Sequence, residues 1–173
     1  LSKADGLSVQ AQNLNNAGGT VQANSGDLQA RGTDVLDNNG GKILTGAGKV
    51  TLGASELRNQ HGVIEAQGGD LTATTATFDN SQGSVVANSV EITSSTRLNN
   101  DHGHIVATQG DLDIKQGEVL NHAGQLSARK NLNIDADSLD NQGGILGGET
   151  IDLTLAGLLG NASGLIEAGE RLD

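Results

Sequence analysis

Histidines and their acidic neighbours are the residues of this sequence with the clearest capacity for chemistry. Asp101-His102-Gly103-His104 places two imidazoles and a carboxylate within four residues, and such groups ligate zinc. The sequence contains a repeat of about 20 residues, described below, and His61 occupies the position equivalent to His102 two copies earlier. If the copies stack as strands, these two histidines are separated by roughly 10 Å. That separation is too large for one tetrahedral site, so we predict exposed histidines in bends and no metal ligand.

Catalytic groups are the second kind of chemistry to consider. No Ser/His/Asp arrangement is visible, the acids are scattered, and Lys and Arg number 10 against 21 Asp and Glu. The Gly-Gly-x-Gly-x-Asp nonapeptide of calcium-binding β-rolls is also absent. Asn161-Ala162-Ser163 matches the acceptor pattern for N-glycosylation, but such short motifs occur by chance. We therefore predict no enzyme, no catalytic residue and no cofactor.

The composition indicates a folded chain with a narrow core. A formal net charge of −11 argues against binding to nucleic acid or to anionic lipid, because both need clustered Lys and Arg. No apolar run is long enough to cross a bilayer. Disorder is the first alternative, but the apolar residues are regularly placed, which a disordered chain does not require. With no Pro, Cys, Met, Trp or Tyr, and Phe78 as its one aromatic residue, the core has few bulky groups.

The strands and turns that would position these side chains come from one sequence repeat that occurs eight times. Each copy opens on a large apolar residue, at Leu14, Leu36, Leu57, Phe78, Leu98, Leu120, Leu139 and Leu159. In seven copies an asparagine stands two places later, at Asn16, Asn38, Asn59, Asn80, Asn100, Asn141 and Asn161. A turn glycine comes next, at Gly19, Gly41, Gly62, Gly83, Gly103, Gly124, Gly144 and Gly164. The irregular copy at Leu120 has His122 in place of asparagine, so we expect a kink or a gap in the asparagine row there.

Periodicity within each copy predicts the fold class. Apolar residues alternate with a period of two, which indicates short strands with one inward face, separated by turn-forming residues. One copy has too little apolar surface to fold alone, whereas stacked copies line a continuous interior. We therefore predict an all-β, right-handed parallel β-helix (solenoid) of about eight coils of 19–22 residues, roughly 40 Å long at the usual strand spacing. Residues 1–173 form one segment of the repeat, which we expect to be excised from a longer fibrous protein.

Asparagines and charges both favour in-register stacking of the coils. An inward asparagine at the same corner of every coil can donate to the next one, forming a structural ladder, although asparagine also favours turns for local reasons. Charges alternate between consecutive copies at Asp37, Arg58 and Asp79, which favours the same register. Glu91 and Asp113 depart from this rule, because they would be like-charged neighbours.

Three phrases carry a family resemblance: LDNNGGKILTGAGKVTL at residues 36–52, LDNQGGILGGETIDL at 139–153 and LNNAGGTVQANSGDLQA at 14–30. Over its whole length the chain resembles the haemagglutinin repeats of filamentous haemagglutinin-like exoproteins of Gram-negative bacteria. The resemblance implies two-partner secretion through an outer-membrane transporter and a fibre on the cell surface. It also implies that the whole protein is either an adhesin or a contact-dependent growth-inhibition effector.

The resemblance leads us to expect a structural shaft segment of a secreted, surface-exposed adhesin that mediates cell contact. The alternative is a receptor-binding segment of a contact-dependent growth-inhibition toxin-delivery protein, which would recognise a cell-surface protein or glycan. Threonine-rich residues 72–78 and 91–97 could form an exposed hydroxyl patch, although the β-propensity of threonine also accounts for them. We expect no nucleic-acid partner and no membrane insertion. Unpaired strand edges at the two ends predict end-to-end association of the fragment.

Overall fold

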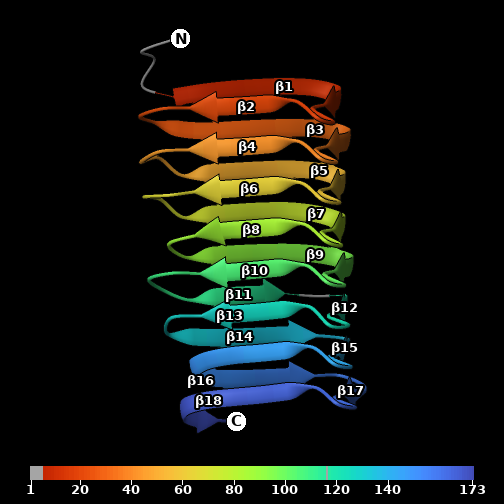
Figure 1. Cartoon of the computed structure of the whole chain (residues 1–173). Coiled ribbons are helices and arrows are strands. Elements are labelled where there is room, and N and C mark those ends of the chain that lie inside the picture. The colour runs from red at the N-terminus through yellow and green to blue at the C-terminus, as the bar shows by residue number, and fades with distance from the viewer. Residues whose placement is uncertain (1–5, 116) are drawn as a thin grey trace.

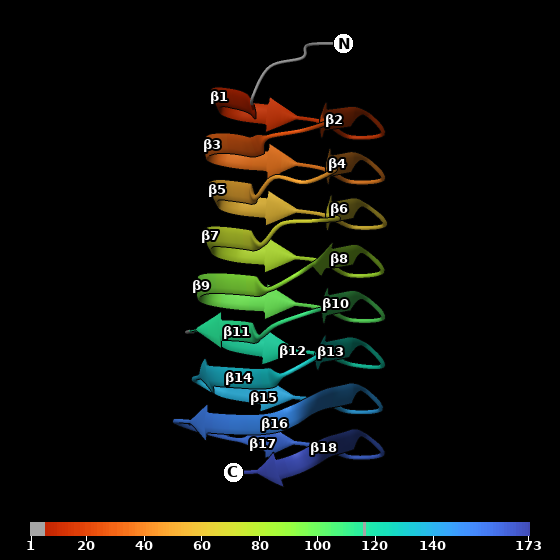
Figure 2. The same ribbon diagram turned by 90° about the vertical axis from the view of Figure 1, so that its left-hand side faces the viewer.

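The computed structural model describes residues 6–115 and 117–173 of the chain. These residues form strands and turns only, wound into a rod of about eight coils (Figures 1 and 2). The first nine strands are β1 (Gly6–Asn15), β2 (Thr20–Ala23), β3 (Asp27–Asp37), β4 (Lys42–Thr45), β5 (Val50–Arg58), β6 (Val63–Ala66), β7 (Leu71–Asp79), β8 (Ser84–Ala87) and β9 (Val90–Asn99). The remaining strands are β10 (His104–Ala107), β11 (Leu112–Lys115), β12 (Glu118–Leu120), β13 (Gln125–Ala128), β14 (Asn131–Ala136), β15 (Ser138–Asp140), β16 (Ile145–Leu155), β17 (Leu159–Gly160) and β18 (Leu165–Leu172).

Every strand pairs in parallel with the equivalent strand of the next coil. The short strands β2, β4, β6 and β8 stack in one column, and the long strands β1, β3, β5, β7 and β9 stack in another. Ile43, for example, lies opposite Ile64, which lies opposite Val85. The predicted all-β parallel solenoid of about eight coils is therefore confirmed. In the first half of the rod each coil has one short and one long strand, because each long strand bends at a corner without ending.

The core is a narrow column that runs through the middle of the coils. The aliphatic residues that the period of two placed inward are fully buried, among them Leu28, Ile64 and Ile105. Phe78 is only 1% exposed and takes the place that leucine occupies in the coils above and below it. Parallel pairing satisfies the backbone and the stacked side chains fill the interior, so each coil is stabilised by its neighbours.

Copy six differs from its predicted alignment. Val119, not Leu120, is the buried opening residue, and Leu120 is half-buried on the outer side of β12. Lys115 pairs with Thr93 and Glu118 pairs with Arg97. Two residues therefore join Lys115 to Glu118, where three join Thr93 to Arg97. Two residues also join Thr74 to Thr77 in β7, so the corner of copy six has the same length as that one, and the extra residue is in β9. The hydrogen-bonded row of asparagines described below passes through this copy, so the expected gap was wrong.

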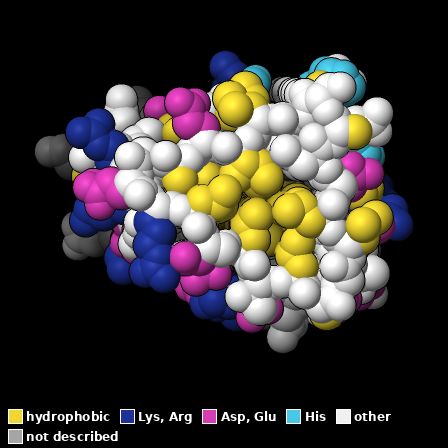
Figure 3. All heavy atoms as spheres, turned by 90° about the horizontal axis from the view of Figure 1, so that it is seen from below, with side chains coloured by type: hydrophobic (Ala, Val, Ile, Leu, Met, Phe, Trp, Pro, Cys, Tyr) yellow, Lys and Arg dark blue, Asp and Glu magenta, His cyan; other side chains and the backbone are white. Residues whose placement is uncertain are grey.

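The two ends of the rod lie far apart, with β1 at the top of Figure 1 and β18 at the bottom. The C-terminal end shows a cluster of apolar side chains (Figure 3). Among the residues that the structure describes, the exposed large apolar ones are all in the last part of the chain: Ile145, Leu158, Leu159, Leu165 and Leu172. Within the described ranges there is no helix with the length and hydropathy needed to cross a membrane.

Candidate functional site: the asparagine ladder and the histidine bridge

Asparagine side chains form one continuous row inside the rod. In each coil the Nδ2 group donates to the Oδ1 atom of the next asparagine, over N–O distances of 2.6–2.8 Å. Each amide from Asn38 to Asn161 also donates to the carbonyl of the turn glycine three residues later, at 3.2–3.4 Å. The row consists of the seven predicted residues and one more: Asn16, Asn38, Asn59, Asn80, Asn100, Asn121, Asn141 and Asn161.

Asn121 is the member that the sequence alignment missed. His122 had been placed in the row, but Asn121 accepts from Asn100 and donates to Asn141, both at 2.7 Å. Asn121 stands three residues before Gly124, the spacing that every other copy has between its asparagine and its turn glycine. Counting back from the glycine would have found it, whereas counting forward from the opening residue did not.

The turn glycines are required by close packing. Gly83 donates its N–H to the carbonyl of Asn80, which closes a tight turn. A Cβ atom on Gly83 would lie 2.2 Å from the carbonyl oxygen of Asn59, a ladder residue of the preceding coil. The corresponding distance is 2.1–2.3 Å for Gly41, Gly62, Gly103, Gly124, Gly144 and Gly164, and Gly19 would meet the side chain of Asn16 at 2.6 Å. Any side chain here would force the coils apart.

The residue immediately before each turn glycine has a positive φ angle. Glycine takes this place in three coils, but His61, Gln82, His102, Ala123 and Ser163 take it in the others, with φ between 50° and 57°. The left-handed conformation is costly for residues that carry a Cβ atom. His61 and His102 are both exposed, in the turns of two separate coils. Among the described residues no group of three or more His, Asp or Glu has the geometry to hold a metal ion.

Acidic and amide side chains cap these turns from outside the core. The residue before the ladder asparagine accepts, through Oδ1, the N–H of the residue two places later, at 2.9–3.1 Å, in five coils: at Asn15, Asp37, Asp79, Asn99 and Asp140. Arg58 and Leu120 occupy the capping position in two other coils and have no such oxygen. There the cap comes from the preceding coil: Asn39 accepts the N–H of Gln60, and Asp101 accepts that of His122.

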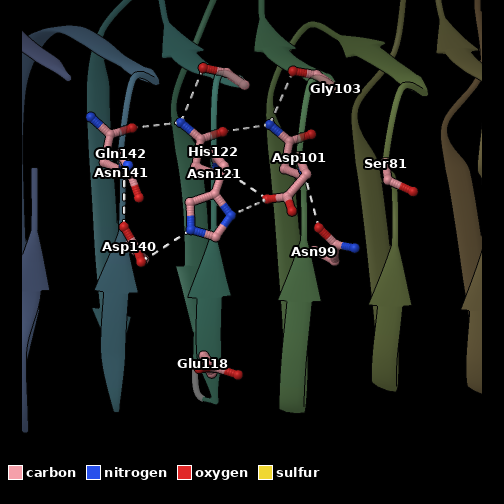
Figure 4. Close-up of polar contacts among 12 residues, drawn as sticks. Ser81, Asn99, Asp101, Gly103, Glu118, Asn121, His122, Asp140, Asn141 and Gln142 are labelled. Atoms are coloured by element: carbon pink, nitrogen blue, oxygen red, sulfur yellow. Dashed lines mark hydrogen bonds and ion pairs between the residues drawn. The ribbon is translucent and has the colours of Figure 1, made fainter. Parts of the chain in front are cut away.

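His122 joins three successive coils (Figure 4). Its Nδ1 atom lies 2.9 Å from Oδ1 of Asp101 in the preceding coil, and its Nε2 atom lies 3.0 Å from Oδ2 of Asp140 in the following coil. About a third of the His122 side chain is exposed, so the bridge is on the surface of the rod. The hydrogen bond with Asp101, followed by that with Asp140, raises the pKa of His122. The hydrogen bond from His122 lowers the pKa of Asp140.

The other charged side chains follow the predicted rows only in part. Arg58 lies 4.0 Å from Asp37, but its closer partner is Glu56 on its own strand, which it contacts through two hydrogen bonds of 2.8 Å. Glu91 and Asp113 are neighbours in the register, as the sequence indicated. Lys115 lies 2.7 Å from Glu91 and offsets that repulsion. These exposed pairs favour the register and add little stability.

An all-parallel rod with an internal asparagine ladder defines a β-solenoid repeat protein. The haemagglutinin repeat model matches residues 1–35, 23–113 and 82–173. The chain therefore belongs to the haemagglutinin-repeat family of filamentous haemagglutinin-like exoproteins, as its resemblance to that family had indicated.

Two curated relatives are contact-dependent growth-inhibition proteins by name. The chain is 31% identical to "Toxin CdiA" of Yersinia pestis over 185 aligned positions, which cover 98% of the chain and 6% of that protein. It is 48% identical to "Deoxyribonuclease CdiA" of Dickeya dadantii (strain 3937) over 64 positions, covering 37% of the chain and 2% of that protein. The chain thus spans a small part of the length of these relatives. No solved structure matches it.

Proposed function

We propose that this segment is a structural shaft of a secreted, surface-exposed filamentous protein that mediates contact between cells. The observation that supports this role most directly is the unbroken ladder from Asn16 to Asn161, which links coil to coil along the rod. A stack in which each coil contacts only its neighbours can be lengthened by adding coils, because the contacts between the existing coils stay the same. Membership of the haemagglutinin-repeat family supports export by two-partner secretion through an outer-membrane transporter.

A coil deletion in the intact parent protein tests the shaft role. Removing residues 59–79 joins Arg58 to Asn80, whose backbone position is in register with that of Asn59, so the ladder continues one coil shorter. A shaft retains export and cell contact after this deletion, with a reach reduced by about one strand spacing. The matched control removes residues 59–69 only, which leaves half a coil and breaks the register. Loss of cell contact in the whole-coil deletion, with export intact, would refute the shaft role.

The alternative is a receptor-binding segment, and one feature of the surface favours it. Thr74 of β7 and Thr93 of β9 are opposite each other in the register, and Thr72 lies opposite Thr51 of β5. These four side chains are outside the core and lie on three adjacent coils, so they present hydroxyl groups to a protein or glycan.

Binding of the purified segment to target cells separates the two roles. The shaft role predicts no saturable binding, whereas the receptor-binding role predicts saturable binding that Thr74→Glu and Thr93→Glu abolish. The shaft proposal also holds that the segment is not an enzyme, so cleavage of cell-surface polysaccharide by the purified segment would contradict it.

End-to-end association of the purified segment is a further part of this proposal. The last coil exposes Leu158, Leu159 and Leu165 beside unpaired strand edges, and such edges associate. Small-angle scattering over a range of protein concentrations is expected to show elongated oligomers. Leu158→Lys and Leu165→Glu on this end should reduce association, and a monomeric profile of the unchanged segment at high concentration would contradict it.

A further inference from the structure

His122 lies in a turn that lacks the usual cap from its own coil. Leu120 occupies the capping position and has no side-chain oxygen to accept the turn N–H. Asp101 compensates from the coil before, because its Oδ1 atom accepts the backbone N–H of His122 at 3.1 Å and contacts the ring at 2.9 Å. The same carboxylate therefore caps the turn and holds one side of the imidazole.

Carboxylate oxygens face both nitrogens of the imidazole. An ionised carboxylate only accepts hydrogen bonds, and a neutral imidazole has a single N–H to donate. In the neutral ring, one nitrogen lone pair would point at Asp101 or at Asp140 across about 3 Å. Only the doubly protonated ring donates to both carboxylates, and charge-assisted hydrogen bonds of this kind are the stronger ones.

We propose that His122 is a proton-controlled brace, whose charged ring ties three successive coils together at the turn after β12 and whose deprotonation releases one of its two carboxylates. The brace lies outside the core, so protons reach it from solvent. The ladder beneath it, through Asn100, Asn121 and Asn141, carries no ionisable group and is unaffected. The device thus changes the local stiffness of the rod while the fold persists.

Two other acidic groups on these coils, Glu118 and Asp79, have partners of their own. On its own strand β12, Glu118 lies at the far end from His122 (Figure 4) and pairs with Arg97 of β9 at 2.9 Å. The backbone N–H of His102, in the turn after β9, donates to the carbonyl of His122. Asp79, one coil further up, accepts from Asn99. The facing charges are therefore Asp101 above the ring and Asp140 of β15 below it.

The sign of the pH dependence follows from the two pKa directions. The pKa of His122 is raised above the ordinary histidine value of 6.5, so its stabilisation is complete below that value and is lost as pH rises through the folded pKa. The pKa of Asp140 is lowered below the ordinary aspartate value of 3.8, so its stabilisation is present above that value and is lost as pH falls through the folded pKa. The brace is strongest in the pH interval between these two ordinary values.

Replacing each aspartate with asparagine removes the charge and preserves the cap. Asn39 caps Gln60 from the preceding coil as Asp101 caps His122, and Asn99 caps Asp101 as Asp140 caps Gln142. Asp101→Asn, Asp140→Asn and the double variant therefore keep the turns intact. An NMR titration of the His122 ring in the whole chain is expected to give a pKa above 6.5 that falls in each single variant and falls furthest in the double variant. An equal His122 pKa in the unchanged chain and the double variant would overturn the proposal.

Hydrogen exchange measures the loosening itself. The amide of Asn121, bonded to the Asp140 carbonyl at 2.8 Å, reports on the braced corner, and that of Asn80, bonded to Asn99 at 2.7 Å, is the control site. Between about pH 5.5 and about pH 8, the protection factor at Asn121 should fall about two- to fivefold, the range for an exposed ion pair, while that at Asn80 stays constant. His122→Gln should abolish the pH dependence at Asn121. A fall that persists in His122→Gln, or no fall in the unchanged chain, would refute the brace.

Discussion

Removal of one amide from the middle of the ladder is the most informative perturbation of this protein. Asn80 is fully buried, accepts from Asn59 at 2.7 Å and donates to Asn100 at 2.8 Å. In Asn80→Ala the Nδ2 group of Asn59 retains only its longer contacts to backbone carbonyls, at 3.3 and 3.5 Å. The Oδ1 atom of Asn100 loses its ladder donor altogether.

The expected cost follows from these atoms. A buried acceptor left without a partner costs about 1–3 kcal/mol, and the second lost hydrogen bond adds about 1 kcal/mol. We therefore expect Asn80→Ala to lower the free energy of unfolding by about 2–4 kcal/mol. Asn161→Ala, at the half-exposed last position of the row, removes one ladder bond and should cost less than about 1.5 kcal/mol.

Urea unfolding followed by far-ultraviolet circular dichroism measures both variants, because the chain has no Trp or Tyr for fluorescence. Asn80→Asp supplies an internal control of nearly the same shape. Burial raises the pKa of the introduced carboxyl, and its protonated form can accept from Asn59 and donate to Asn100 as the amide does. The destabilisation relative to the unchanged chain should therefore shrink as pH falls. If Asn80→Ala costs no more than Asn161→Ala, the ladder does not stabilise the rod and the reasoning fails.

Three further predictions concern single positions and use the same unfolding assay. Gly83→Ala should destabilise by about 3 kcal/mol or more because its Cβ would overlap a backbone carbonyl, whereas Gly53→Ala, whose nearest neighbour is 3.8 Å away, should be tolerated; equal effects would contradict the packing argument. Ala123→Gly should stabilise by about 0.5–1 kcal/mol, because φ at this position is 50°, and any loss of stability would disprove that account. Phe78→Leu should cost less than about 1.5 kcal/mol because leucine occupies the same place in both adjacent coils; a larger loss would show that the coil is built around the ring.

Fold class, coil number and most of the ladder could be predicted from the sequence because the geometry of a solenoid is set by short-range sequence patterns that repeat from coil to coil. A strand must alternate inward and outward residues. The turn from Asn80 to Gly83 is closed by a backbone hydrogen bond, which fixes a spacing of three residues between asparagine and glycine, and the other coils repeat that spacing. The same periodicity placed Phe78 in the core, where the structure has it. These features depend on contacts within one coil or between equivalent places of two coils.

The register of copy six and the brace at His122 were decided by the tertiary structure. Val119 and Leu120 are both apolar, and only the pairing of Val119 with Leu98 shows which of them opens the copy and hence that Asn121 is in the ladder. Asp101 and Asp140 are separated from His122 by 21 and 18 residues, and only stacking brings their carboxylates to opposite sides of one ring. The sequence by itself determined that the chain winds into stacked parallel coils, since apolar alternation and turn chemistry act over a few residues. The tertiary structure decided which side chains meet between coils, since that depends on the summed length of every corner between them.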